Sequence, residues 1–175
     1  VGNKGGTIAD GSVILRSKNK GLSWKSSNYT GGSFGTLTSL AYRKMNGIPY
    51  LICVGYQISS SNGQVYSSSN NGSTWTLSAT KFTFGQSLFK FPALQAVSLG
   101  TNGNAFASGH ASSRSSSFFN IFKSDSGSSY QSWVSTASWN VTGYIVNGIS
   151  TYDGINVIAV GSKENVDFTY SGVIF

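Results

Sequence analysis

Residues 68–75 read Ser-Ser-Asn-Asn-Gly-Ser-Thr-Trp, and residues 17–24 follow the same scheme as Ser-Lys-Asn-Lys-Gly-Leu-Ser-Trp. In both stretches Asn stands two residues after the first Ser, Gly two residues after the Asn, and Trp three residues after the Gly. An Asn side chain can accept backbone N–H groups across a turn, Gly supplies a conformation that other residues rarely adopt, and Trp packs beneath the turn. The pattern predicts a polar turn bonded to itself, with a structural role.

A third copy of this turn spans residues 124–133 and keeps Ser and Trp at its ends. Nine residue steps separate those ends, where the other copies have seven, so the register of this copy is open. We assign Asp125 and Gly127 to the Asn and Gly positions. The predicted turn residues are Ser17, Asn19, Gly21, Trp24, Ser68, Asn70, Gly72, Trp75, Ser124, Asp125, Gly127 and Trp133.

A longer repeat surrounds these turns. Val1-Gly2, Val54-Gly55, Ser108-Gly109 and Val160-Gly161 recur at spacings of 53, 54 and 52 residues. Each of the last three follows an apolar segment, an Asn-Gly or Asp-Gly pair and a second apolar segment. Such pairs favour tight primed turns and predict β-hairpins. The pairs are Asn46-Gly47, Asn102-Gly103 and Asp153-Gly154.

The repeat predicts an all-β protein, a β-propeller of four-stranded antiparallel blades. A small sheet cannot cover both of its faces, so copies stack around an axis and bury one another. We expect two complete blades, at about residues 37–80 and 93–137, flanked by three-stranded partial blades at about 1–30 and 146–175. A closed propeller of four or more blades needs about 210 residues. We therefore expect a segment of a larger propeller, or a partial one completed by another copy.

The turns resemble the Asp-box, or BNR repeat, whose pattern is Ser-x-Asp-x-Gly-x-Thr-Trp between the third and fourth strands of a propeller blade. Asn19 and Asn70 stand where that family usually has Asp. The family includes sialidases, xyloglucan hydrolases, sortilin-like sorting receptors and photosystem II assembly factors. The resemblance implies the propeller fold, and we interpret this chain as a non-catalytic member.

Composition narrows the class of protein further. Of the 175 residues, 39% are apolar, 14% aromatic and 10% charged, which excludes a coiled coil and argues against disorder. Twelve Lys and Arg against five Asp and Glu give a formal charge of +7, which makes an anionic partner conceivable. The basic side chains that cluster locally, which we interpret as solvated loop lysines, are Lys4, Lys18, Lys20 and Lys25. We expect no nucleic-acid partner, and no membrane span because no apolar run reaches 18 residues.

Catalytic residues are not apparent. A sialidase-like enzyme should carry three arginines around a substrate carboxylate, a Tyr nucleophile assisted by Glu, and an Asp acid/base. The arginines are Arg16, Arg43 and Arg114, and no Arg-Ile-Pro signature occurs. Hydrolysis by paired carboxylates needs two acids about 5–9.5 Å apart. Asp125 and Asp153 belong to turns, and the acids left in loops after second strands of blades are Asp10, Glu164 and Asp167. We interpret these three as surface acids and predict no enzymatic activity.

Metal and cofactor sites are likewise not predicted. His110 and Cys53 are the sole His and Cys, and they cannot by themselves make a transition-metal site. Cys53 lies in an apolar run, which predicts a buried, inert thiol.

Our leading hypothesis is a secreted or cell-surface propeller that serves as a structural or protein-interaction module and self-associates through exposed strand edges. The extracellular location rests on low charge, on the family's secreted habit and on possible N-glycosylation at Asn28, Asn71 and Asn140. One alternative is a carbohydrate-binding propeller in which aromatic residues stack on sugars, the candidates being Trp24, Trp75, Trp139 and Tyr152. Two others are a fragment of an Asp-box glycoside hydrolase with catalytic residues outside this chain, and an assembly factor of the photosystem type that uses a basic face.

Overall fold

Four successive groups of antiparallel strands make up the chain in the computed structural model, which describes residues 2–3, 12–29, 35–57, 62–80, 82, 90–112, 117–140, 144–164 and 170–174. The first blade holds β1 (Gly2–Asn3), β2 (Ser12–Val13), β3 (Leu15–Arg16) and β4 (Lys25–Ser26). The second holds β6 (Thr36–Met45), β7 (Ile48–Gln57), β8 (Asn62–Ser68) and β9 (Thr74–Leu77). The third holds β10 (Lys90–Leu99), β11 (Ala105–Ser112), β12 (Ser117–Ser124) and β13 (Val134–Asn140). The fourth holds β14 (Tyr144–Ser150), β15 (Ile158–Glu164) and β16 (Tyr170–Ile174).

Each complete blade is a simple meander in which every strand pairs with the next along the chain. The short strand β5 (Asn28–Tyr29) leaves the first blade and pairs in parallel with β9, so that it extends the second sheet to five strands. In the first blade β1 pairs with β2 and β3 with β4. The expected class, an all-β propeller with two complete blades between two partial ones, is confirmed.

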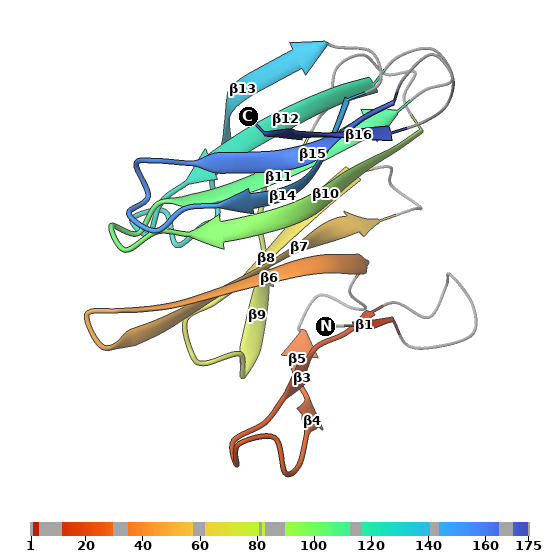
Figure 1. Ribbon diagram of the computed structural model, residues 1–175. Coiled ribbons are helices and arrows are strands. Elements are labelled where there is room, and N and C mark those ends of the chain that lie inside the picture. The colour runs from red at the N-terminus through yellow and green to blue at the C-terminus, as the bar shows by residue number, and fades with distance from the viewer. Residues whose placement is uncertain are drawn as a thin grey trace.

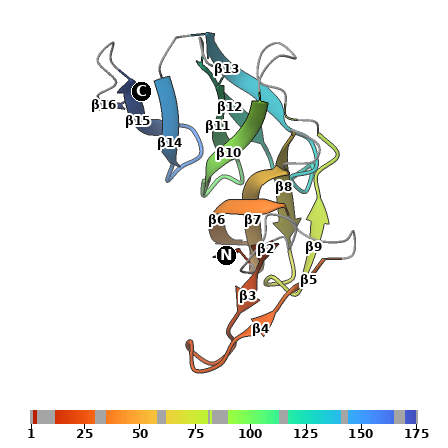
Figure 2. The same cartoon turned by 90° about the vertical axis from the view of Figure 1, so that its right-hand side faces the viewer.

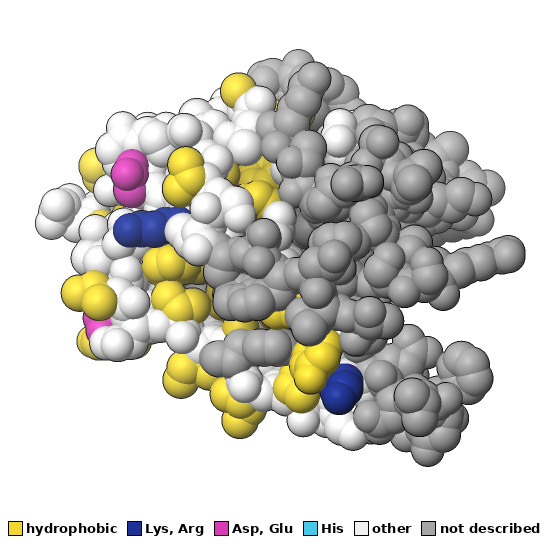
Figure 3. Space-filling view, turned by 90° about the horizontal axis from the view of Figure 1, so that it is seen from above, with side chains coloured by type: hydrophobic (Ala, Val, Ile, Leu, Met, Phe, Trp, Pro, Cys, Tyr) yellow, Lys and Arg dark blue, Asp and Glu magenta, His cyan; other side chains and the backbone are white. Residues whose placement is uncertain are grey.

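The blades fan out around their first strands. Figures 1 and 2 show β6, β10 and β14 toward the inside of the arc, with the later strands of each blade farther out. The hydroxyl of Thr38 on β6 donates to the carbonyl of Leu94 on β10 at 2.7 Å, which ties two inner strands together. Seen from above, apolar side chains reach the described surface in several places, with few charged side chains among them (Figure 3).

The turns between the first two strands of each blade differ more than the sequence predicts. Asn46 and Gly47 form the expected two-residue turn, with φ of 48° and 82°. The prediction of equally tight turns at Asn102-Gly103 and Asp153-Gly154 is wrong, because β10 and β11 are joined by residues 100–104 and β14 and β15 by residues 151–157. In the second of these loops the Asp153 carboxylate accepts the backbone N–H groups of Ile155 and Asn156, both at 2.8 Å, which stabilises a wider turn.

Facing blades bury the same repeat positions. Val54 on β7 aligns with Ser108 and Val160, so Ile52 two residues earlier aligns with Phe106 and Ile158. Ile52 is 0% and Phe106 7% exposed where the following blade covers them, whereas Ile158 on the last blade is 57% exposed. Exposure at this position is therefore set by the neighbouring blade and not by the residue type, which is apolar in all three copies.

The opposite face of each blade obeys the same rule. The box tryptophans Trp75 and Trp133 are 1% and 5% exposed, and each belongs to an apolar cluster with residues of the preceding blade. Trp24 of the first blade is 59% exposed. The expectation that Trp24 packs as a plug is wrong, because the covering that buries the other two comes from outside the blade.

This arrangement predicts unequal effects of one substitution at two equivalent positions. Ile52→Ala removes buried methyl groups and should lower the free energy of unfolding by about 2–5 kcal/mol. Ile158→Ala acts on an exposed side chain and should change that free energy by less than about 0.5 kcal/mol. Urea unfolding of both variants in dilute solution measures the difference, and equal losses would contradict the dependence of burial on the neighbouring blade.

Candidate functional site

The box turns of the first two blades have one shared hydrogen-bond scheme. In the second blade the Asn70 Oδ1 atom accepts the backbone N–H of Thr74 at 3.0 Å, and the Ser68 hydroxyl accepts that of Gly72 at 3.0 Å. In the first blade Asn19 accepts the N–H of Ser23 at 2.9 Å and Ser17 that of Gly21 at 2.8 Å. The amide nitrogens donate to Thr74 and Ser23 hydroxyls, at 2.7 and 2.8 Å, a bond that the usual Asp could not donate.

The third box has a different register from the one assigned from the sequence. The residues with positive φ just before its Trp are Ser129 and Tyr130, at 51° and 60°, in the place of Asn71 and Gly72. Tyr130 therefore stands at the box glycine, and the assignment of Gly127 to that position is wrong. The two extra residues are absorbed earlier in the turn, where Asp125 accepts the N–H of Ser128 at 2.9 Å.

Two of the arginines connect blades. Arg16 donates to the carbonyl of Asn71 at 3.0 Å and to the hydroxyl of Ser73, both in the next box turn. The Arg43 Nη2 atom donates to the carbonyl of Leu99 at 2.9 Å, and its guanidinium lies 5.5 Å from the ring centroid of Tyr152. Both guanidinium groups thus donate hydrogen bonds to backbone carbonyls of neighbouring blades. Arg114 lies outside the described residues, so an arginine cluster is not assembled by the described part of the chain.

Most of the other predicted site residues lie outside the described residues or have side chains that are not described. Asp10 and Asp167 lie outside the described residues, and Glu164 ends β15 with its side chain outside the description. Asn71 is exposed in the second box turn, whereas the side chains of Asn28, Asn140 and Trp139 are not described. Tyr152 is exposed, and Trp75 is buried and so unavailable for stacking on a sugar.

The lone cysteine is fully buried, and the lone histidine is partly buried. Cys53 is fully buried, as predicted, and that burial raises its pKa to about 12. Burial lowers the pKa of His110, whose Nδ1 atom has no hydrogen-bond partner among the described residues. The described residues contain no group of three or more metal-binding side chains, and no helix among them is long and apolar enough for a membrane span.

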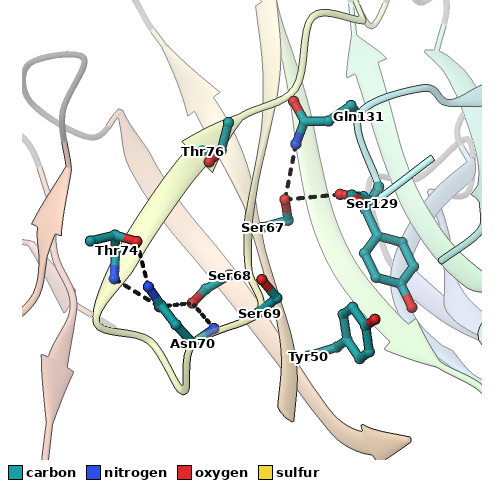
Figure 4. Close-up of a pocket in the computed structure, with 10 residues that line it drawn as sticks. Tyr50, Ser67, Ser68, Ser69, Asn70, Thr74, Thr76, Ser129 and Gln131 are labelled. Atoms are coloured by element: carbon teal, nitrogen blue, oxygen red, sulfur yellow. Dashed lines mark hydrogen bonds between the residues drawn. The ribbon is translucent and has the colours of Figure 1, made fainter. Parts of the chain in front are cut away.

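The pocket between the second and third box turns is the candidate site that the sequence did not indicate. It has a volume of about 220 Å³, and its wall is formed on one side by residues of β8, β9 and their turn and on the other by residues 129–131 (Figure 4). The ring of Tyr50 meets the ring of Tyr130 edge-on, with centroids 5.7 Å apart. Tyr50 also lines an adjoining pocket of about 400 Å³ that contains Arg43 and Lys44.

Comparison of the three box turns could have revealed this pocket. The residue just before the first Ser is Arg16 in the first box turn, Ser67 in the second and Lys123 in the third. The residue three positions before the Trp is Gly in the first two box turns and Tyr130 in the third. Both substitutions meet at the junction of the second and third blades. The register of the third box had to be known before the second substitution became visible.

Comparisons with known proteins support the fold and nothing finer. No protein-family model matches the chain, and no curated protein matches it. Among solved structures, a mutant of the NanB sialidase from Streptococcus pneumoniae is similar, with a TM-score of 0.57 and 17% sequence identity over 93% of this chain. The match covers 25% of the sialidase chain. This chain therefore has a sialidase-like propeller fold, as the Asp-box resemblance implied.

The partly buried His110 predicts acid sensitivity in one pH range. Its folded-state pKa lies below the ordinary value of 6.5, so the unfolded chain binds the proton more readily. The stability contributed by the neutral imidazole is complete above pH 6.5 and is lost as the pH falls toward the lowered pKa. The free energy of unfolding should thus decrease as the pH falls below about 6.5. His110→Gln should flatten this decrease in urea unfolding at each pH, and an unchanged slope in the variant would contradict the assignment.

Proposed function

We propose that this sialidase-like propeller chain is a non-catalytic binding module of the cell exterior that associates with further copies of itself, head to tail. The single observation that carries this proposal is the pair of exposed apolar faces on its first and last blades. The extracellular location rests on the low charge and on the three sequons, of which Asn71 is exposed on a turn.

The last blade carries the half of an interblade interface that normally meets a following blade. Three positions define this half, and the second and third blades bury all of them. In the fourth blade Ile158, Val160 and Ile174 occupy them and are exposed. Val160 and Ile174 pair across β15 and β16, as Val54 and Val65 do across β7 and β8, so the apolar side chains form one continuous patch.

The first blade carries the other half. Leu15 aligns with the buried Tyr66 of the second blade and is half exposed. Trp24, the tryptophan of the first box turn, is also exposed. Leu22 in the same turn is also exposed. Since each of these positions contacts a preceding blade elsewhere in the chain, the first blade of one copy matches the last blade of another.

Such a contact joins two different surfaces and therefore extends into rings or filaments. Burial of each large apolar side chain contributes about 1.5–3 kcal/mol, enough for several of them to support association.

Two blocking variants test both the association and its polarity. Ile158→Asp places a carboxylate on the last blade and Trp24→Asp places one on the first, and burying either without a partner is strongly unfavourable. Each variant alone should be monomeric in light scattering, whereas the parent chain should increase in mass as its concentration is raised. A mixture of the two variants should form dimers, because each keeps the face that the other lacks.

Several results would overturn the proposal. A parent chain that is folded and monomeric at all concentrations removes the association, and a Trp24→Asp variant that still dimerises alone shows a contact between like faces. Ser135→Asp, at an exposed site on β13, is the control and should associate as the parent does. Hydrolysis of a fluorogenic sialoside by the chain would contradict the non-catalytic assignment.

A further inference from the structure

We propose that the pocket between the second and third box turns is a carbohydrate-binding subsite that takes one neutral, hydroxyl-rich sugar unit. This goes beyond the association proposed above, since it concerns a different surface and a different ligand. It also differs from sugar stacking on the box tryptophans, because Trp75 and Trp133 are buried and the exposed Trp24 does not line this pocket.

The pocket exists because a small residue replaces an arginine. Arg16 and Ser67 hold the same repeat position, and both donate a hydrogen bond to the equivalent carbonyl of the next box, Arg16 to Asn71 at 3.0 Å and Ser67 to Ser129 at 3.2 Å. At the first junction the long Arg side chain occupies the space between the turns. At the second junction the serine makes the same bond and leaves that space open.

The exchange of glycine for Tyr130 shapes what remains. A Cβ atom on Gly72 would lie 3.7 Å from the Cδ atom of Arg16, so the arginine packs against the glycine at the first junction. At the second junction Tyr130 fills part of the corresponding space. Its hydroxyl donates to the carbonyl of Gly103 at 3.1 Å, and its ring is held against Tyr50, so the wall that it forms is fixed.

The walls present the groups that a sugar needs. The hydroxyl groups of Tyr50, Ser69 and Thr76 make no hydrogen bond to the other residues drawn in Figure 4. Gln131 donates through Nε2 to Ser67 at 3.0 Å, which orients its amide oxygen as a further acceptor. Among the described residues that line the pocket there is no Lys, Arg, Asp or Glu, so the unit bound there should be uncharged.

The dimensions and the surroundings agree with a single sugar ring of a longer chain. A volume of about 220 Å³ is below the roughly 300–1,000 Å³ of pockets that take drug-sized ligands. The ring of Tyr50 supplies an apolar face with a polar tip, the combination that suits the mixed C–H and O–H surface of a sugar. The adjoining pocket, which shares Tyr50, offers Lys44 to the next unit.

Saturation-transfer NMR with glucose, galactose, mannose and N-acetylglucosamine tests the subsite. At least one of these sugars should receive saturation from the parent chain. Ser67→Arg restores the residue that the repeat itself uses at the first junction, so it should fold and should weaken the interaction at least about tenfold. Ser135→Arg, the same change on an exposed strand position away from the pocket, should bind as the parent does.

A second variant keeps the test valid if Ser67→Arg fails to fold. Tyr50→Phe keeps the ring and removes one hydroxyl, so it should weaken binding about fivefold. Absence of transfer to all four sugars, or transfer that persists in both pocket variants, would overturn the proposal. Equal transfer to glycerol would also overturn it, since that result shows a polyol contact without recognition of a sugar.

Discussion

Burial of sheet faces between neighbouring blades is the interaction on which the rest of this structure depends. Short four-stranded sheets expose two apolar faces that a further layer must cover, and in this chain the neighbouring sheets cover them. The main core accordingly joins Ile52, Val54 and Val65 of the second blade to Leu94, Val97 and Phe122 of the third. A second cluster joins the first blade to the second through Ile14 and Trp75, and a third cluster joins the third blade to the fourth through Phe119 and Val146.

Hydrogen bonds between blades add to this apolar packing. Arg16 and Arg43 bring donors to backbone carbonyls that belong to other blades, and Thr38 does the same between inner strands. Where a short side chain makes the contact between blades, as Ser67 does, the blades stay together through their apolar core and a pocket opens at the rim. Packing therefore fixes the blade arrangement, and the residues at the rim can differ from blade to blade.

Much of the fold was predictable because the period of the repeat and its turn residues are local signals. The two regular boxes could be assigned from spacing alone, since Asn19 and Asn70 bond within their own turns. The third box could not, because two extra residues allowed either Gly127 or Tyr130 to take the glycine position, and only backbone φ values distinguish them. The exposure of Trp24 and the loop at Asp153 depend on contacts outside the local sequence, which the same residue pattern does not reveal.

Each blade draws its stability from the neighbours that cover it. Hydrogen exchange of backbone amides in the intact, dilute chain measures this blade by blade. We expect the slowest exchange in β7, β8, β11 and β12, which are covered on both sides, and clearly faster exchange in β15, whose outer face is open. Protection of β15 equal to that of β7 and β11 would show that a blade is stable without a covering neighbour and would contradict the account.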